Sequence, residues 1–226
     1  MNAIAQLNDV SKLYGNFAAL RHVTASFQAG RCYVVLGENG AGKSTLLRML
    51  AGLLRPTLGS ITTFGATPQD EQHRIGYMSH ATMLYDELTA MENLCYYASL
   101  YANVGGGYRC ACSGKPESAL RAVGLDPALA RPVGQYSQGM RQRASLARVL
   151  LSDPELLLLD EPFSNMDAAS AQQMVTLLHQ LQSPANGGAQ RTIILTTHQP
   201  ELARPIANYF LTMRAGQIVQ TQEVAA

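Results

Sequence analysis

The sequence predicts an α/β fold with a mixed β-sheet core, an antiparallel β region at the N-terminus and an α-helical lobe inserted near the middle. Three observations predict it. Residues 31–36 are apolar and lead through a glycine-rich loop into a segment with leucines at helical spacing. Residues 155–160 are rich in leucine without interruption, which is typical of a strand buried on both faces of a parallel sheet. Between these strands, residues 88–150 form a largely helical block, which indicates an inserted lobe.

Length and composition favour one domain. The 226 residues suit a single domain over 1–226, with a core at 1–80 and 152–226 and a helical lobe at about 88–150. Apolar residues make up 47% of the chain, enough for a sizeable core. The net charge of +1 gives no argument for a nucleic-acid partner. No apolar run could span a bilayer and no signal peptide is recognisable, so we expect a cytosolic location.

The individual elements follow from periodicity and turn residues. Alternating polarity predicts an antiparallel hairpin or meander that turns at Tyr14-Gly15, with strands at 4–10 and 17–27. Further strands are expected at 31–36, 60–64, 74–78, 155–160 and 192–197, and a C-terminal hairpin at 209–213 and 217–221. Helices are expected at 43–53, 88–101, 116–123, 127–130, 138–151 and 168–181. Glycine-rich breaks are expected at 105–107 and in a loop at 184–188.

The four cysteines are Cys32, Cys95, Cys110 and Cys112. The pair Cys110 and Cys112 could form half of a metal site, but no further ligands have suitable spacing nearby. Free thiols in a reducing compartment are the favoured interpretation.

The loop after the first apolar strand carries the clearest chemical motif. It fits the P-loop pattern G-x-x-x-x-G-K-[ST] at every fixed position, with the residues Gly37, Glu38, Asn39, Gly40, Ala41, Gly42, Lys43, Ser44 and Thr45. Backbone N–H groups of such a loop, together with the N-terminus of the following helix, form a cradle for phosphates. Lys43 would contact the outer phosphates and the Ser44 hydroxyl would ligate Mg²⁺. The alternative is a chance glycine-rich turn. The motif predicts that the chain binds a nucleoside triphosphate.

Two carboxylates end the leucine-rich strand. Asp160 is placed to reach the same Mg²⁺ as Ser44. Glu161, directly after it, can deprotonate a water for attack on the γ-phosphate. The alternative is a pair of solvated carboxylates before a turn at Pro162. Together with the P-loop, the pair predicts hydrolysis as well as binding.

Residues 136–143, Tyr-Ser-Gln-Gly-Met-Arg-Gln-Arg, resemble the signature of ATP-binding-cassette (ABC) nucleotide-binding domains. Ser137 lies 23 residues before Asp160, a spacing typical of that family. The resemblance covers nearly the whole chain and implies a P-loop NTPase core of the ABC type, with ATP and Mg²⁺ as ligands. It also implies a head-to-tail dimer with an identical or a different cassette, in which Ser137 and Gly139 contact the ATP of the other subunit. An ordinary Ser N-cap would explain Ser137 alone.

Further site residues come from the resemblance one by one. Tyr14 resembles the aromatic residue that stacks on adenine, with an ordinary turn tyrosine as the alternative. Asp167, in the segment 164–167, resembles the D-loop aspartate at the dimer interface. His198 resembles the switch histidine that contacts the γ-phosphate. The sequence departs from the family at His80, where Gln is usual, and at Gln138, which replaces a Gly. We expect an active ATPase, with His80 near the attacking water or Mg²⁺.

The resemblance also implies partners. The membrane-spanning part of a transporter would be another polypeptide. This chain would lie on its cytoplasmic side and contact it through residues near 80–93. Met83, Leu84, Tyr85 and Leu88 could receive a short helix there, or pack locally. Segments around His80, at 88–94, at 160–163 and at 195–200 are similar to the haem-exporter ATPase of cytochrome c maturation. One alternative is a soluble ABC ATPase acting on DNA or ribosomes, which is disfavoured because the sequence has no coiled-coil insertion and no basic patch. A second is a non-hydrolysing subunit, which is disfavoured because the set of motifs is complete.

Overall fold

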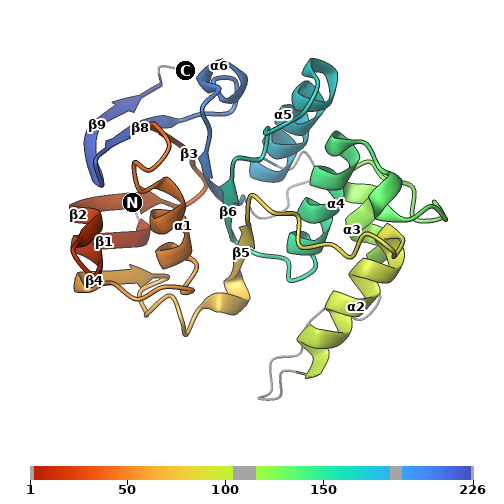
Figure 1. The fold of residues 1–226 in the computed structure, drawn as a ribbon, viewed down its shortest axis with the longest axis horizontal. Coiled ribbons are helices and arrows are strands. Elements are labelled where there is room, and N and C mark those ends of the chain that lie inside the picture. Colours follow the sequence, from red (N-terminus) through yellow and green to blue (C-terminus); the bar gives the residue numbers. More distant parts are fainter. Residues whose placement is uncertain (1–2, 104–115, 184–189, 225–226) are drawn as a thin grey trace.

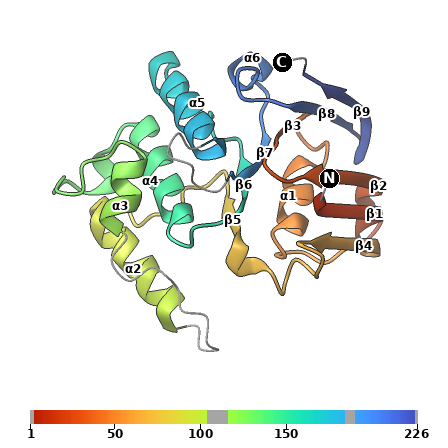
Figure 2. The ribbon, with the colours of Figure 1, turned by 180° about the vertical axis from the view of Figure 1, so that it is seen from behind.

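The computed structural model describes residues 3–103, 116–183 and 190–224. Figures 1 and 2 show the strands gathered on one side of the molecule and most of the helices on the other. The predicted breaks at 105–107 and 184–188, and the Cys110/Cys112 pair, lie outside the described residues.

The N-terminal region forms a three-stranded antiparallel sheet. Its strands are β1 (Ala3–Tyr14), β2 (Phe17–Gln28) and β4 (Leu58–Thr63), in the order β2-β1-β4. Buried and exposed side chains alternate along these strands because one face of the sheet is buried. Leu7, Val10 and Val23, on the buried face, are at most 1% exposed. The predicted hairpin is confirmed, and the predicted strand at 60–64 pairs with β1 in the same sheet.

The central sheet has six strands in the order β5-β6-β7-β3-β8-β9. These are β3 (Cys32–Leu36), β5 (Ile75–Met78), β6 (Leu156–Asp160), β7 (Thr192–Thr196), β8 (Tyr209–Arg214) and β9 (Gln217–Glu223). Neighbouring strands run parallel except β9, which pairs antiparallel with β8. The predicted mixed sheet is therefore confirmed.

The leucine run of β6 faces two separate cores. Leu156 and Leu158 pack into the core shared with β1, β2 and α1 (Lys43–Leu50), whereas Leu157 and Leu159 pack into the core shared with the helices. Successive side chains of a strand point to opposite faces, so a strand covered on both sides has no polar positions. In strand β3, burial also raises the pKa of the Cys32 thiol to about 12, which keeps it protonated and inert.

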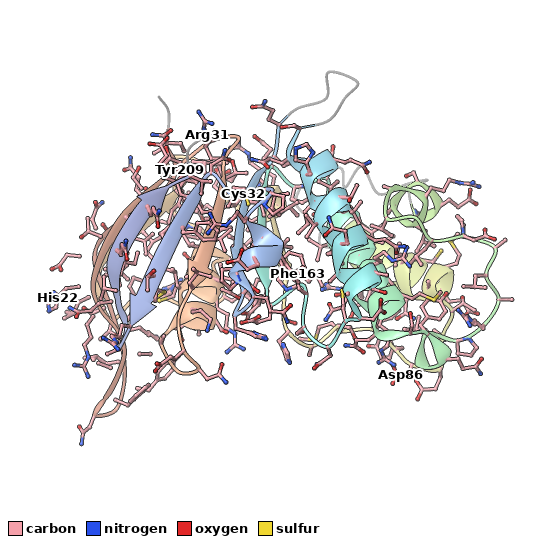
Figure 3. All side chains as sticks on the ribbon, turned by 90° about the horizontal axis from the view of Figure 1, so that it is seen from above. His22, Arg31, Cys32, Asp86, Phe163 and Tyr209 are labelled. Carbon is pink, nitrogen blue, oxygen red and sulfur yellow. The ribbon has the colours of Figure 1, made fainter. Side chains whose placement is uncertain are left out.

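The helices cover the second face of the sheet. They are α2 (Ala90–Asn103), α3 (Pro116–Ala122), α4 (Gln138–Leu150), α5 (Ala168–Gln182) and the short α6 (Pro200–Ala203), with 3₁₀ turns at Gln72–Arg74 and Val133–Gln135. Helices α2, α3 and α4 contact one another, and α5 packs on α4. Figure 3 shows Phe163 between the sheet and the helices, where it is 1% exposed. This buried residue therefore joins the strand side of the molecule to the helical side.

Two predicted helices differ from the structure. The helix expected at 127–130 is wrong: the Asp126 carboxylate accepts the Ala128 N–H at 2.9 Å, and the segment is a turn. The helix expected over 43–53 ends at Leu50 because Gly52 adopts a φ of 72°, and the Leu53 N–H bonds back to the Arg48 carbonyl. Both differences are local side-chain or glycine effects that override helical spacing.

Candidate functional site

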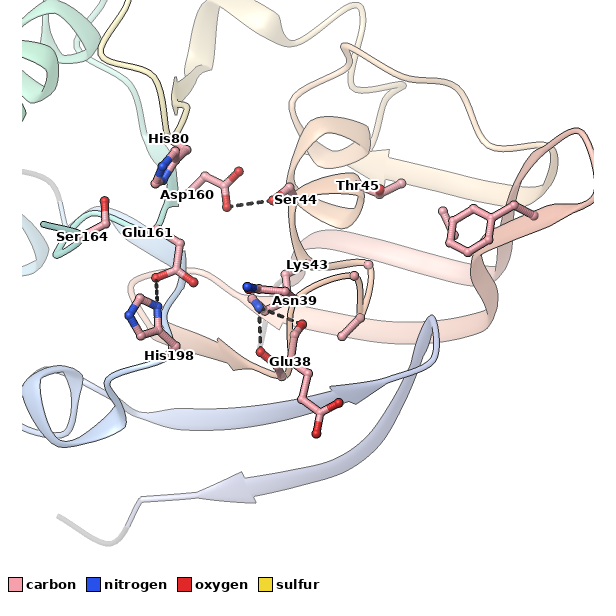
Figure 4. Close-up of a pocket in the computed structure, with 16 residues that line it drawn as sticks. Glu38, Asn39, Lys43, Ser44, Thr45, His80, Asp160, Glu161, Ser164 and His198 are labelled. Carbon is pink, nitrogen blue, oxygen red and sulfur yellow. Dashed lines mark hydrogen bonds and ion pairs between the residues drawn. The ribbon is translucent and has the colours of Figure 1, made fainter.

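A cavity of about 760 Å³ lies between the glycine-rich loop and the carboxyl ends of β6 and β7. We call it the P-loop cavity; it is lined by Phe17, Ala19, residues 37–45, His80, Asp160, Glu161, Ser164 and His198. Figure 4 shows the loop on one side and His80, Asp160, Glu161, Ser164 and His198 on the other. The fold thus brings together most of the predicted site residues, which come from four separate segments: 37–45, His80, 160–161 and His198.

The glycine-rich loop has a conformation that needs its glycines. Gly40 and Gly42 have φ values of 81° and 100°, which disfavour a residue with a Cβ. A Cβ on Gly42 would lie 2.6 Å from the Ala19 carbonyl oxygen. The loop therefore packs its backbone against strand β2 at a distance that only glycine allows.

Lys43 begins α1 and points back into the loop. Its ammonium donates to the carbonyl oxygens of Gly37 at 2.6 Å and Glu38 at 3.1 Å, and the residue is 7% exposed. Helix α1 has no acidic residue in its own first turn, so its N-terminal N–H groups and the Lys43 ammonium together form a positive region at the loop. An anion such as a phosphate chain is stabilised there.

Asp160 is held by hydroxyl groups from two elements. Ser44 Oγ donates to Asp160 Oδ1 at 3.0 Å, and Thr196 Oγ1 donates to the same oxygen at 2.8 Å. The Asp160 residue is 3% exposed. Mg²⁺ prefers a few oxygen ligands and keeps several waters, so the adjacent Ser44 hydroxyl and Asp160 carboxylate at the cavity wall fit it.

Glu161 and His198 form a hydrogen-bonded pair. His198 Nδ1 lies 2.9 Å from Glu161 Oε2, and the Glu161 N–H donates to Thr196 Oγ1 at 2.9 Å. Glu161 has a left-handed backbone with φ of 54°, a conformation that costs energy for a residue other than glycine. These contacts hold the Glu161 carboxylate at the cavity wall, where it can act as a general base toward a water in the cavity.

Ser137 and Gly139 are not among the residues that line the P-loop cavity. Ser137 is the N-cap of α4 and accepts the Met140 N–H at 3.3 Å, so the N-cap alternative describes its contact within this chain. A Cβ on Gly139 would lie 2.6 Å from Ser170 Cβ, at the start of α5. The N-termini of α4 and α5 therefore meet at a point where a side chain on Gly139 has no room.

Asp167 lies at this same junction. It caps α5 by accepting the Ser170 N–H at 2.8 Å and the Ser170 hydroxyl at 2.7 Å. These hydrogen bonds lower the pKa of the Asp167 carboxyl, because they stabilise its ionised form. Its predicted place at a dimer interface stays a prediction.

The aromatic residue that lines the cavity is Phe17, not Tyr14. Tyr14 is 49% exposed at the other side of the hairpin turn, paired in register with Phe17, and the Lys12 ammonium lies 5.3 Å from its ring centroid. The predicted adenine contact of Tyr14 is therefore not brought into the cavity within this chain. The sequence analysis places none of Phe17, Ala19 and Ser164 at this cavity; it includes Ser164 only in the segment 164–167 that resembles the D-loop.

Residues 20–164 match the family model described as ABC transporter. The ABC transporter ATP-binding protein NatA of Bacillus subtilis (strain 168) is 34% identical over 206 residues, which cover 89% of this chain and 80% of that protein. The ergothioneine transport ATP-binding protein EgtV of Helicobacter pylori (strain G27) is 32% identical, covering 95% and 99%. The bacitracin transport ATP-binding protein BcrA of Bacillus licheniformis is 36% identical, covering 88% and 62%.

Solved structures share the fold. A dimeric ATP-binding cassette in a post-hydrolysis state, bound to ADP and phosphate, matches with a TM-score of 0.84 over 98% of this chain and 99% of that one, at 23% identity. A nucleotide-free ATP-binding cassette from an ABC transporter matches with a TM-score of 0.85 over 99% and 92%, at 20% identity. These likenesses confirm the predicted fold class.

Proposed function

We propose a role for this chain from the premise that it belongs to the ABC transporter family and is an ATPase of that family. The role is to power transport by a separate membrane-spanning subunit, through dimerisation driven by ATP. The observation that carries the proposal is the separation of two proposed anion-binding features: the P-loop cavity is lined without Ser137 and Gly139, which lie outside it in this chain. A second cassette would supply what one chain lacks.

Each cavity residue has a proposed task in hydrolysis. The backbone of residues 37–45 and the Lys43 ammonium bind and orient the phosphates. Glu161 takes a proton from the attacking water, and His198 holds the Glu161 carboxylate through their 2.9 Å contact. Ser44 and Asp160 would hold Mg²⁺, which when bound neutralises charge on the phosphates.

The proposed partner of this chain's signature segment, residues 136–143, is the ATP on a second cassette. Helix α4 has 13 residues and no acidic residue in its first turn, so its N-terminus favours an anion. The Ser137 side chain is exposed at that end. A head-to-tail pair of chains would place one such N-terminus over each P-loop, and a dimeric state is recorded for a solved cassette of the same fold.

The proposed membrane subunit would contact an exposed apolar patch on the helical side. Met83, Tyr85, Tyr96 and Leu100 are between 42% and 57% exposed, and the rings of Tyr85 and Tyr96 meet edge to face at 5.3 Å. Buried Asn93 shapes this patch by bonding both the Tyr85 N–H, at 2.8 Å, and the Tyr85 carbonyl, at 3.0 Å. Leu84 instead packs against the core, so local packing explains that residue. A short amphipathic helix fits such a surface.

Within the described residues, every helix is too short or too polar to cross a bilayer. We infer a peripheral position on the cytoplasmic face of the membrane, held by the partner subunit. The cargo hypothesis is haem export for cytochrome c maturation, which rests on the similarity of the segments around His80 and at 88–94, 160–163 and 195–200. The relatives named above bear different cargoes in their names, so the cargo needs its own test.

Co-expression tests the transport role. The chain and a membrane protein encoded beside it would be purified together, and ATP hydrolysis measured with and without that subunit in lipid vesicles. We expect co-purification and faster hydrolysis in the complex, and both should be lost with Tyr85→Asp. Arg121→Asp, on α3, is the matched surface control. A complex that forms equally well with Tyr85→Asp would rule out this docking surface, and hydrolysis indifferent to the subunit would rule out coupling.

A further inference from the structure

The hydroxyl of Ser164 is buried at the edge of the P-loop cavity without a hydrogen-bond partner. Ser164 is 5% exposed and lines the cavity. No donor or acceptor within the described part of the chain pairs with its Oγ atom. Since a buried polar group without a partner costs free energy, such a group at a cavity wall points to a ligand that pairs with it when bound.

The backbone holds Ser164 against the base. Its N–H donates to the Glu161 carbonyl at 3.1 Å, which closes a tight turn from Glu161 to Ser164. Glu161 and Asn165 on either side both have left-handed backbones, with φ of 54° and 58°. Figure 4 shows Ser164, His80 and Glu161 on the side of the cavity opposite the loop that would bind phosphates, with the Ser164 hydroxyl directed toward the His80 side of that wall. The turn therefore holds Ser164 at the same cavity wall as the general base.

We propose that Ser164 is a further catalytic residue, whose hydroxyl hydrogen-bonds the water that attacks the γ-phosphate. This inference rests on the proposed hydrolysis of ATP in this cavity. The water gives one proton to Glu161 and directs its other O–H to Ser164 Oγ, which keeps its own proton. The water oxygen bonds to the γ-phosphorus as the bond to the bridging oxygen breaks, leaving ADP and phosphate. Two fixed acceptors orient the water's lone pair toward phosphorus.

The test compares two buried hydroxyls that lack partners. Ser164→Ala removes the one at the cavity, while Thr63→Val removes one in β4, where Thr63 is 0% exposed and its Oγ1 also has no partner among the described residues. Neither loss breaks a hydrogen bond within the described structure, so neither variant should unfold at a lower temperature. We expect Ser164→Ala to reduce kcat roughly tenfold with KM for ATP little changed, as for one hydrogen bond lost at the reacting water. Thr63→Val should leave both constants unchanged.

Three results would overturn the inference. The first is a kcat for Ser164→Ala within twofold of the wild type. The second is a loss of kcat accompanied by a lower unfolding temperature, which would mean a structural role. The third concerns Glu161→Gln, a variant expected to hold ATP in a dimer without hydrolysing it: a weaker ATP-dependent dimer when Ser164→Ala is added to it would assign the hydroxyl to the partner interface. A wild-type chain that hydrolyses no ATP would contradict the proposed function as well, so the two failures are distinguishable.

Discussion

The P-loop and the signature segment are both proposed anion sites at the start of a helix, but they are built differently. In the P-loop, Lys43 and Ser44 already donate hydrogen bonds to groups that line the same cavity. The Asp160 carboxylate accepts hydrogen bonds from two hydroxyl groups. In the signature segment, Ser137 only caps its own helix, and Gly139 is pressed against Ser170. The first site is assembled by the fold of one chain, whereas the second presents an exposed serine that lies outside the P-loop cavity of its own chain.

The two segments also need glycine for different reasons, at Gly42 and at Gly139. Gly42 needs a left-handed backbone and lies against the Ala19 carbonyl, so its constraint belongs to the phosphate cradle itself. Gly139 has an ordinary helical backbone, and its constraint is the side chain of Ser170. Substitutions at the two positions should therefore fail at different steps, one at ATP binding and the other at pairing of two cassettes.

Removing the base should have the largest effect. Glu161→Gln should reduce ATP hydrolysis by roughly a factor of a thousand, because an amide cannot accept the water's proton. ATP affinity should stay near the wild-type value, and an ATP-bound dimer should accumulate on size-exclusion chromatography. Glu38→Gln is the matched control, since Glu38 lines the same cavity without contacting His198. Unchanged turnover in Glu161→Gln would remove Glu161 from the catalytic role.

Gly42→Ala should abolish ATP binding by a single chain. A Cβ 2.6 Å from a backbone oxygen cannot be relieved by moving a side chain, and the φ of 100° is strained for alanine. Fluorescent-nucleotide titration measures the loss directly. Gly65→Ala controls for backbone strain, because its φ is 86° but a Cβ there meets nothing within 4 Å. Normal binding by Gly42→Ala would show that the cradle tolerates movement of β2.

Gly139→Ala should instead spare ATP binding and weaken dimerisation. Its Cβ would displace Ser170 at the junction of α4 and α5, and so shift the N-terminus that is proposed to meet the partner's ATP. Adding Ser170→Gly removes the opposing Cβ and should restore much of the ATP-dependent dimer in the Glu161→Gln background. If adding Ser170→Gly restores no dimer, the requirement for glycine at position 139 comes from contact with the partner's nucleotide and not from packing against Ser170.

The smallest expected effect concerns His80. His80 lines the P-loop cavity at the position where the family usually has Gln. Either side chain can hydrogen-bond a water, so His80→Gln should change kcat by at most a few fold at neutral pH. Steady-state kinetics measures the change, and a loss of kcat greater than tenfold would show that the His80 ring has a task that glutamine cannot perform.

Most of the fold was predictable because burial leaves a pattern. Strands covered on both faces read as unbroken apolar runs, as Leu156–Leu159 do, and the half-buried β1 and β2 alternate. The turn at 127–130 was missed because a single Asp126 hydrogen bond overrides the helical pattern. The P-loop cavity followed from motifs, but Phe17 and Ser164 did not, since hairpin register and an unpaired hydroxyl exist only in three dimensions.

The central claim is that one ATP uses Lys43 from one chain and Ser137 from another. Mixing two inactive variants, Lys43→Ala and Ser137→Arg, under conditions that exchange subunits tests it most directly. In a mixed dimer one site carries both lesions and the other carries neither. With random pairing and independent sites, about a quarter of all sites should recover hydrolysis, by two-fold symmetry. A site built within one chain would recover nothing, since every chain carries a lesion. No gain in hydrolysis or in ATP-dependent dimerisation would contradict a shared site between identical chains.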